Sequence, residues 1–367
     1  MRAPAGSFGY ADVRLDNPLF LNESTILPQA YFYAGKETGS VDLDRDNPSP
    51  VSALIVSDQV LYAVTGGGYE AIDTQGTLVG APRTSVAQLI ISDVTNPVNP
   101  ELITKPTLEG DLPYHLNVTL PPDGFRGIKR SDDDLYLFGG DRLYHFDITL
   151  PTDPLLLAEI TLPDDVNDVF VEDGLVFVGG QFGLRIYSLD ENRELQLGKS
   201  LGVSEIGGAP YQLISRDAEL FALLADEGEV AVLDLMSGQY QRLHTITLED
   251  EDSGAFRAES MLVQDDFLMV TTGRRASVRL YLVDTGNVSQ FAAELNLSYL
   301  VRNGDLFADQ LLLKGQTLYV SAGQGDLQLF DVSPWLDYRF NTGIDLQHYF
   351  SLLGAVNGFA FSADAIY

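Results

Sequence analysis

The stretch that decides the fold is Leu135-Tyr136-Leu137-Phe138-Gly139-Gly140, followed after two residues by Leu143-Tyr144-His145-Phe146-Asp147. Two apolar runs of strand length flank a glycine pair, and the second run closes on an aspartate. Glycines between two such runs are typical of a tight β-hairpin turn. The stretch therefore predicts two neighbouring antiparallel strands.

Both elements recur along the chain, and helical periodicity is nearly absent. Further copies of the first element begin at Leu61, Leu175, Leu220, Leu268 and Leu318, and a partial copy, Ala365-Ile366-Tyr367, ends the chain. Further copies of the second begin at Leu89, Leu184, Val230, Leu280 and Leu327, and a weaker copy, Phe8-Gly9-Tyr10-Ala11-Asp12, stands near the start. Seven copies spaced by about 52 residues predict an all-β, seven-bladed β-propeller, in which four-stranded blades pack around an axis.

The order of the elements predicts how the ring closes. If the strands of a blade are labelled A to D from the axis outwards, the first element is strand B and the second is strand C. The chain begins with strand C and ends with strand B. We therefore expect one domain, residues 1–367, with a composite closing blade built from residues 8–21 and 355–367.

Turn sequences after strand C carry a resemblance to a known family. The clearest are Asp93-Val94-Thr95-Asn96-Pro97, Asp147-Ile148-Thr149-Leu150-Pro151 and Asp331-Val332-Ser333-Pro334. This pattern resembles the LVIVD repeat of β-propellers from bacterial and archaeal cell-surface proteins. The resemblance implies a propeller of the WD40-like kind and an extracellular or cell-surface location, in a bacterial chain that is part of a larger multidomain protein. It supplies no general catalytic residues.

The aspartates and glycines of the repeat have a structural interpretation. An Asp that ends a strand accepts hydrogen bonds from backbone N–H groups two or three residues on, and a following Pro fixes the turn. We expect this role for Asp93, Asp147 and Asp331. The glycine pairs at Gly139 and Gly179 are expected to form B–C turns with positive φ.

Charge and composition exclude several classes of function. The formal net charge is −31, from 22 basic and 53 acidic residues, so binding to phosphate backbones or to an anionic membrane surface is disfavoured. With no cysteine, disulfides and thiolate sites are excluded. No apolar run is long enough to insert into a membrane, and the first residues do not form a signal peptide.

Long insertions are expected on one face of the ring. Residues 26–48, 103–124, 201–210 and 248–256 are assigned to D–A connections and residues 66–86 to a B–C connection, which share a face. Loops on a rigid scaffold commonly carry binding groups. Aromatic and basic residues on this face are the predicted ligand contacts, with packing of the loops as the alternative role: Tyr31, Tyr33, Tyr69, Arg83, Tyr114, His115, Arg274 and Arg275. Trp335 is the conspicuous aromatic of the opposite face.

Signals for a metal or for catalysis are weaker. Asp42, Asp44 and Asp46 alternate as in the first half of a calcium loop, but Asn47 and Ala53 stand where that loop has Gly and Glu. A solvated acidic loop is the alternative, so calcium is at most a possible cofactor and none other is expected. The histidines His115, His145, His244 and His348 do not converge, and we expect structural roles for them.

Two functions remain open at this stage. The first is a non-catalytic recognition domain that binds a protein or glycan through its loop-rich face. The second is a propeller hydrolase or lactonase with an axial site, possible because Asp168, Glu259 and Asp309 fall near predicted inner strands. One scaffold hosts many functions, so the fold alone does not choose between them.

Overall fold

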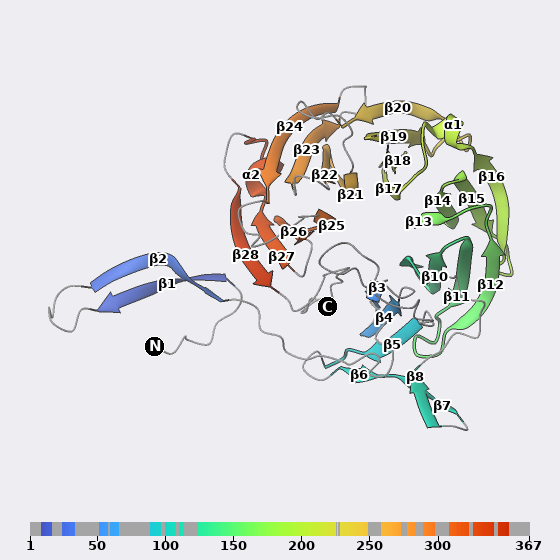
Figure 1. The fold of residues 1–367 in the computed structure, drawn as a ribbon, viewed down its shortest axis with the longest axis horizontal. Coiled ribbons are helices and arrows are strands. Elements are labelled where there is room, and N and C mark those ends of the chain that lie inside the picture. Colours follow the sequence, from blue (N-terminus) through green and yellow to red (C-terminus); the bar gives the residue numbers. More distant parts are fainter. Residues whose placement is uncertain are drawn as a thin grey trace, which may run out of the picture.

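A computed structural model of the chain describes residues 9–16, 24–33, 51–57, 59–65, 89–96, 100–107, 110–113, 124–224, 226, 228–248, 258–272, 277–283, 289–297, 308–322, 326–340 and 344–351. Within these ranges the strands form six four-stranded antiparallel sheets and two two-stranded ones. The six larger sheets stand like blades around a common axis (Figure 1). None of the helices in the described part is long and apolar enough to span a membrane.

The blades are numbered here in chain order. Blade 1 consists of β3 (Val51–Ser57), β4 (Val60–Thr65), β5 (Leu89–Asp93) and β6 (Glu101–Leu102). Blade 2 consists of β9 (Gly127–Ser131), β10 (Asp134–Gly139), β11 (Arg142–Asp147) and β12 (Leu155–Thr161). Blade 3 consists of β13 (Val166–Glu172), β14 (Leu175–Gly180), β15 (Gly183–Leu189) and β16 (Leu195–Leu201).

The remaining blades have the same order. Blade 4 consists of β17 (Gln212–Arg216), β18 (Glu219–Leu224), β19 (Glu229–Asp234) and β20 (Arg242–Thr247). Blade 5 consists of β21 (Ala258–Gln264), β22 (Phe267–Thr272), β23 (Ser277–Val283) and β24 (Ser289–Asn296). Blade 6 consists of β25 (Ala308–Lys314), β26 (Thr317–Ala322), β27 (Asp326–Asp331) and β28 (Asp345–Ser351). Short helices lie between blades 3 and 4, α1 (Val203–Ile206), and inside blade 6, α2 (Ser333–Leu336).

The prediction of seven blades is wrong, because the described residues form six. The seventh copy of each element was a partial match at a chain end. The N-terminal copy lies in β1 (Gly9–Asp16), which pairs antiparallel with β2 (Ser24–Tyr33) in a sheet of their own. Residues 26–33 are thus part of this hairpin and not of a D–A connection. The C-terminal copy, residues 355–367, lies outside the described residues.

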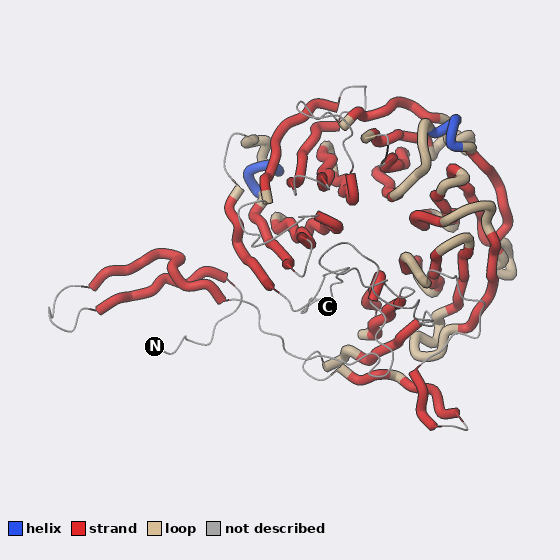
Figure 2. The backbone as a smooth tube through the Cα atoms, viewed as in Figure 1, coloured by secondary structure: helices blue, strands red, loops and turns tan. Residues whose placement is uncertain are grey.

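The assignment of strands within a blade is confirmed. The first element of the repeat is the second strand of each sheet and the second element is the third. The inner strands β9, β13, β17, β21 and β25 contact one another in that order, and the outer strands follow the circumference (Figure 2). The insertion at 103–124 lies between β6 and β9 and contains the hairpin of β7 (Thr104–Thr107) and β8 (Gly110–Pro113). It is a D–A connection, as expected.

Glycines at the B–C turn of blade 2 have two different roles. Gly140 has a φ of 50°, in the left-handed region that favours glycine. Gly139 does not, and neither do Gly179 and Gly180 in blade 3, so the prediction of positive φ is wrong for these three glycines. A Cβ on Gly139 would collide with the carbonyl oxygen of Gly124 and lie 2.9 Å from the backbone nitrogen of Arg126. Gly139 therefore permits close approach of the inner strand.

The core lies between blades rather than within them. One cluster joins blades 5 and 6 and includes Met269, Leu280, Val320 and Trp335. Trp335 on α2 is only 1% exposed. It lies in the C–D connection of blade 6, on the face predicted for it, and its ring fills the space between blades 5 and 6.

Each outer strand from blade 2 to blade 6 carries a bulge at the same register. The pairing shifts between His145 and Phe146 in blade 2, and at the equivalent places in blades 3 to 6. A bulge adds one unpaired residue and bends the strand. These outer strands also expose apolar side chains, among them Leu197, Leu243 and Phe291.

Candidate functional site

One register position of the inner strands brings six residues around the axis. Each lies eight residues before the first residue of strand B in its blade, as Arg126 does relative to Asp134. We call these the axial positions: Ser52, Arg126, Asn167, Tyr211, Glu259 and Asp309. All lie at the start of strand A, so they face the mouth of the ring where the D–A and B–C connections lie. No side-chain geometry is described for Asp309.

Axial residues tie blade 1 to blade 2 and blade 3 to blade 4. The Ser52 hydroxyl in blade 1 donates to the carbonyl oxygen of Phe125 in blade 2, at 2.5 Å. The Asn167 amide in blade 3 donates to the carbonyl oxygen of Pro210 in blade 4, at 2.9 Å. Phe125 and Pro210 each directly precede an axial residue, so the same bond recurs in two interfaces.

A second set of hydrogen bonds between blades comes from residues that directly follow an axial position. The Asp168 carboxylate accepts from the backbone N–H of Leu213 at 2.8 Å, and the side-chain oxygen Oε1 of Gln212 accepts from the backbone N–H of Met261 at 2.6 Å. Lys129 also pairs with Asp168, with 3.1 Å between Nζ and Oδ1. Asp168, which the sequence placed near an inner strand, is thus 5% exposed and bonded to both neighbouring blades.

Arg126 has a different environment from its neighbours in this ring. Its Nη1 donates to Oδ1 of Asn167 at 2.9 Å, and its guanidinium lies 4.8 Å from the centroid of the Tyr211 ring. Its side chain is exposed at the mouth, while Asn167 is buried. Two neutral groups of blades 3 and 4 therefore orient a cation that belongs to blade 2.

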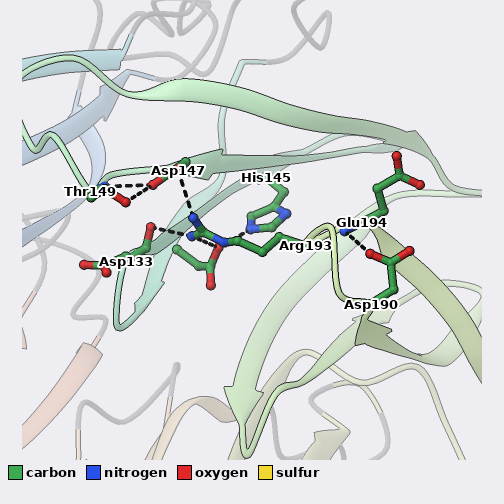
Figure 3. Close-up of polar contacts among 8 residues, drawn as sticks. Asp133, His145, Asp147, Thr149, Asp190, Arg193 and Glu194 are labelled. Atoms are coloured by element: carbon green, nitrogen blue, oxygen red, sulfur yellow. Dashed lines mark hydrogen bonds and ion pairs between the residues drawn. The ribbon is translucent and has the colours of Figure 1, made fainter.

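A second polar cluster joins blades 2 and 3 on the face that carries the C–D turns (Figure 3). Arg193, in the C–D turn of blade 3, contacts Asp134 and Asp147 of blade 2, with 2.5 Å and 2.9 Å between nitrogen and oxygen. His145 Nε2 lies 2.5 Å from the same Asp134 oxygen, and the His145 ring stacks on Tyr136 at 4.7 Å. His145 is fully buried, which fits the structural role expected for it.

Electrostatics of this cluster favour the ionised aspartate. Burial of Asp134 opposes its ionisation, but hydrogen bonds and charge from His145 and Arg193 outweigh burial, so its pKa lies below the ordinary value. Burial, together with the charge of Asp134, raises the pKa of Tyr136. The Tyr136 hydroxyl and Nδ1 of His145 are buried and have no hydrogen-bond partner within the described ranges.

The aspartates that end strand C have the role predicted for them. Asp93, Asp147 and Asp331 each accept from the backbone N–H two residues on, at 2.8–2.9 Å. Hydrogen bonds from Thr95 lower the pKa of Asp93. In blade 3, where Ser188 replaces the aspartate, Asp190 takes over and accepts from the N–H groups of Asn192 and Glu194.

The predicted ligand contacts divide between β2 and residues outside the described ranges. Tyr31 and Tyr33 lie in β2, whose backbone is described. The others lie outside the described residues: Tyr69, Arg83, Tyr114, His115, Arg274 and Arg275, together with the calcium candidates Asp42, Asp44 and Asp46. Among described residues, no group of three or more His, Asp or Glu side chains could hold a metal ion.

Sequence reasoning missed Arg126, Asn167 and Tyr211. They stand at the start of strand A, which has no recognisable motif of its own. The signal that finds them is their fixed distance of eight residues before strand B, since strand B is the most regular element of the repeat.

Comparisons with known proteins support the fold. The chain matches the structure of the periplasmic gluconolactonase PpgL of Pseudomonas aeruginosa with a TM-score of 0.60 and 12% identity, over 95% of this chain and 94% of that one. A protein from Lactobacillus plantarum matches with a TM-score of 0.63 and 11% identity, over 84% and 86% of the two chains. Sqt1 of Chaetomium thermophilum matches with a TM-score of 0.57 and 14% identity, over 86% and 76%.

These likenesses, all far below 25% identity, show a WD40-like β-propeller fold and nothing finer. No protein-family model matches the chain. No curated protein matches it either.

Proposed function

We propose that the chain is a non-catalytic recognition propeller that binds a protein or glycan partner through the face carrying its D–A and B–C connections. In this proposal it belongs to a larger bacterial surface or secreted protein, as its likeness to the LVIVD repeat implies. The proposal extends to an extracellular or cell-surface location.

The observation that supports this proposal best is that polar side chains of the inner strands bond to neighbouring blades. Asp168, the buried acid nearest the axis in blade 3, is bonded to Lys129 of blade 2 and to the Leu213 backbone of blade 4. Ser52, Asn167 and Gln212 make further bonds of this kind. These groups stabilise the contacts between blades, which makes the ring a rigid support for its loops.

A lactonase-like enzyme is the second candidate. The Lys129–Asp168 pair favours it, because an amine and a carboxylate 3.1 Å apart beside the axis are capable of proton transfer. The fold shared with a gluconolactonase is compatible with this alternative. A calcium ion held by Asp42, Asp44 and Asp46 would belong to either candidate.

One experiment separates the two candidates. The full chain and its Asp168→Asn variant are tested for hydrolysis of glucono-δ-lactone, and for binding to a glycan array and to proteins of a cell envelope. We expect binding that survives Asp168→Asn, and no hydrolysis above the spontaneous rate. Hydrolysis that Asp168→Asn abolishes would replace the recognition function by the enzymatic one.

A second set of variants locates the binding face. The candidate contacts predicted for the D–A and B–C connections, Tyr69, Arg83, Tyr114, His115, Arg274 and Arg275, are changed singly to Ala, and so are Tyr31 and Tyr33 of the β1–β2 hairpin. We expect weaker partner binding, with stability changed by at most about 1 kcal/mol where the side chain is exposed. Large losses of stability with unchanged binding would show that these residues only pack the loops.

A further inference from the structure

We infer that Arg126 at the axial mouth is a binding site for a carboxylate group of the ligand, with Tyr211 and Asn167 as the residues that position it. This inference rests on the proposed recognition function and gives its ligand a chemical class. It uses residues that lie on the same face as the D–A and B–C connections.

The geometry leaves one edge of the guanidinium available. Arginine offers five N–H donors in a planar fork. Nη1 is engaged by Asn167, and the face of the group lies on Tyr211. Among described residues, Nε and Nη2 of Arg126 have no partner, so two donors remain for a bidentate acceptor.

Among the described residues, Arg126 has no carboxylate partner, unlike five other arginines. Arg142, Arg193, Arg216, Arg279 and Arg339 each pair with an Asp or Glu. The nearest buried acid, Asp168, is bonded to Lys129 and to the Leu213 backbone instead. Arg126 is therefore an oriented, exposed cation with no acidic partner among the described residues, in a chain of net charge −31.

The charge available favours a carboxylate over a phosphate. A phosphate dianion is best held by more than one cation, but the neighbouring Lys129 is already neutralised by Asp168. The planar guanidinium matches the two oxygens of a carboxylate. The acidic surface repels anions over about 8–10 Å at moderate ionic strength, so added salt should speed association with this site.

The test measures binding of succinate to the full chain by titration calorimetry, with succinamide and inorganic phosphate as comparison probes. We expect a Kd on the order of 1 mM for succinate and weaker binding of the other two. Arg126→Gln should weaken succinate binding at least about tenfold, which corresponds to removal of one charge-assisted contact. Arg126→Lys keeps the charge but not the planar fork of donors, so its affinity for succinate should lie between those of the parent chain and Arg126→Gln.

Arg142→Gln is the matched control, because Arg142 is a partly exposed arginine of the same blade that pairs with Asp141 and Glu159. It should bind succinate like the parent chain. Equal binding by the parent chain and Arg126→Gln would overturn the inference, as would tighter binding of phosphate than of succinate. Partner binding that persists without any succinate binding would refute this site while leaving the recognition function intact.

Discussion

Two neighbouring interfaces of the ring use the same positions of the repeat with different chemistry. Between blades 2 and 3, the third residue of strand B is Tyr136, and Arg193 of the next C–D turn binds Asp134 beside it. Between blades 3 and 4, the same residue is Phe177, whose ring meets Tyr240 of the next C–D turn edge-on at 5.8 Å. The repeat determines where blades touch, and the side chains determine whether the contact is ionic or apolar.

The largest effect is expected at the apolar interface. Phe177 is 1% exposed and also contacts Phe170. Phe177→Ala leaves a cavity between two sheets and should lower the free energy of unfolding by about 3–5 kcal/mol. Urea denaturation measures this loss. Phe177→Leu is the control and should recover most of it, whereas equal losses in both variants would mean that ring geometry, and not volume, matters.

At the ionic interface, Asp134→Ala should cost about 2–4 kcal/mol, because it leaves buried His145 and partly buried Arg193 without their shared partner. Denaturation at neutral pH measures the change. Asp133→Ala is the control, since Asp133 contributes only its backbone carbonyl to Arg193. A similar loss in both variants would contradict the role assigned to the Asp134 side chain.

The ionic interface should also be the acid-sensitive one. The pKa of Asp134 is lower in the folded state than its ordinary value of 3.8. Its contribution to stability is therefore present above that value and is lost as the pH falls through the folded pKa. The stability difference between the parent chain and Asp134→Asn should be constant above about pH 5 and shrink below it. A difference that does not change with pH would exclude ionisation of Asp134 as its source.

The smallest effects come from two tyrosines at the same place in adjacent blades. The Tyr62 hydroxyl donates to the carbonyl oxygen of Pro151 at 2.8 Å, so Tyr62→Phe should cost about 1 kcal/mol. The Tyr136 hydroxyl is buried and has no hydrogen-bond partner in the described part of the chain. Tyr136→Phe should therefore be neutral or stabilising. Thermal melts of the two variants compare them directly, and equal losses would show that Tyr136 has a partner in solution.

Much of the fold could be predicted, since strands B and C carry strong local signals. The apolar runs, the glycines and the aspartate of each C–D turn are local chemistry, and they identified both strands in all six blades. The number of blades, in contrast, could not be predicted from local sequence. Phe8–Asp12 has the composition of strand C, but β1 pairs with β2, and only the partner of a strand decides its sheet.

The axial site was harder to predict for a related reason. Arg126, Asn167 and Tyr211 differ in residue type, and their contacts with one another join blades 2, 3 and 4. Asp168 was found only as an acid near an inner strand. Its bonds to Lys129 and Leu213 depend on residues some forty positions away along the chain.

The repeated bulge of the outer strands has a consequence for crowded solutions. Each outer strand has an edge with no strand beyond it in its sheet, which in a flat form would allow molecules to join side by side into fibres. The bulge at a fixed register bends that edge in blades 2 to 6, beside exposed Leu197, Leu243 and Phe291. A ring built from repeated units thus limits its own polymerisation at the outer edge of five of its six blades.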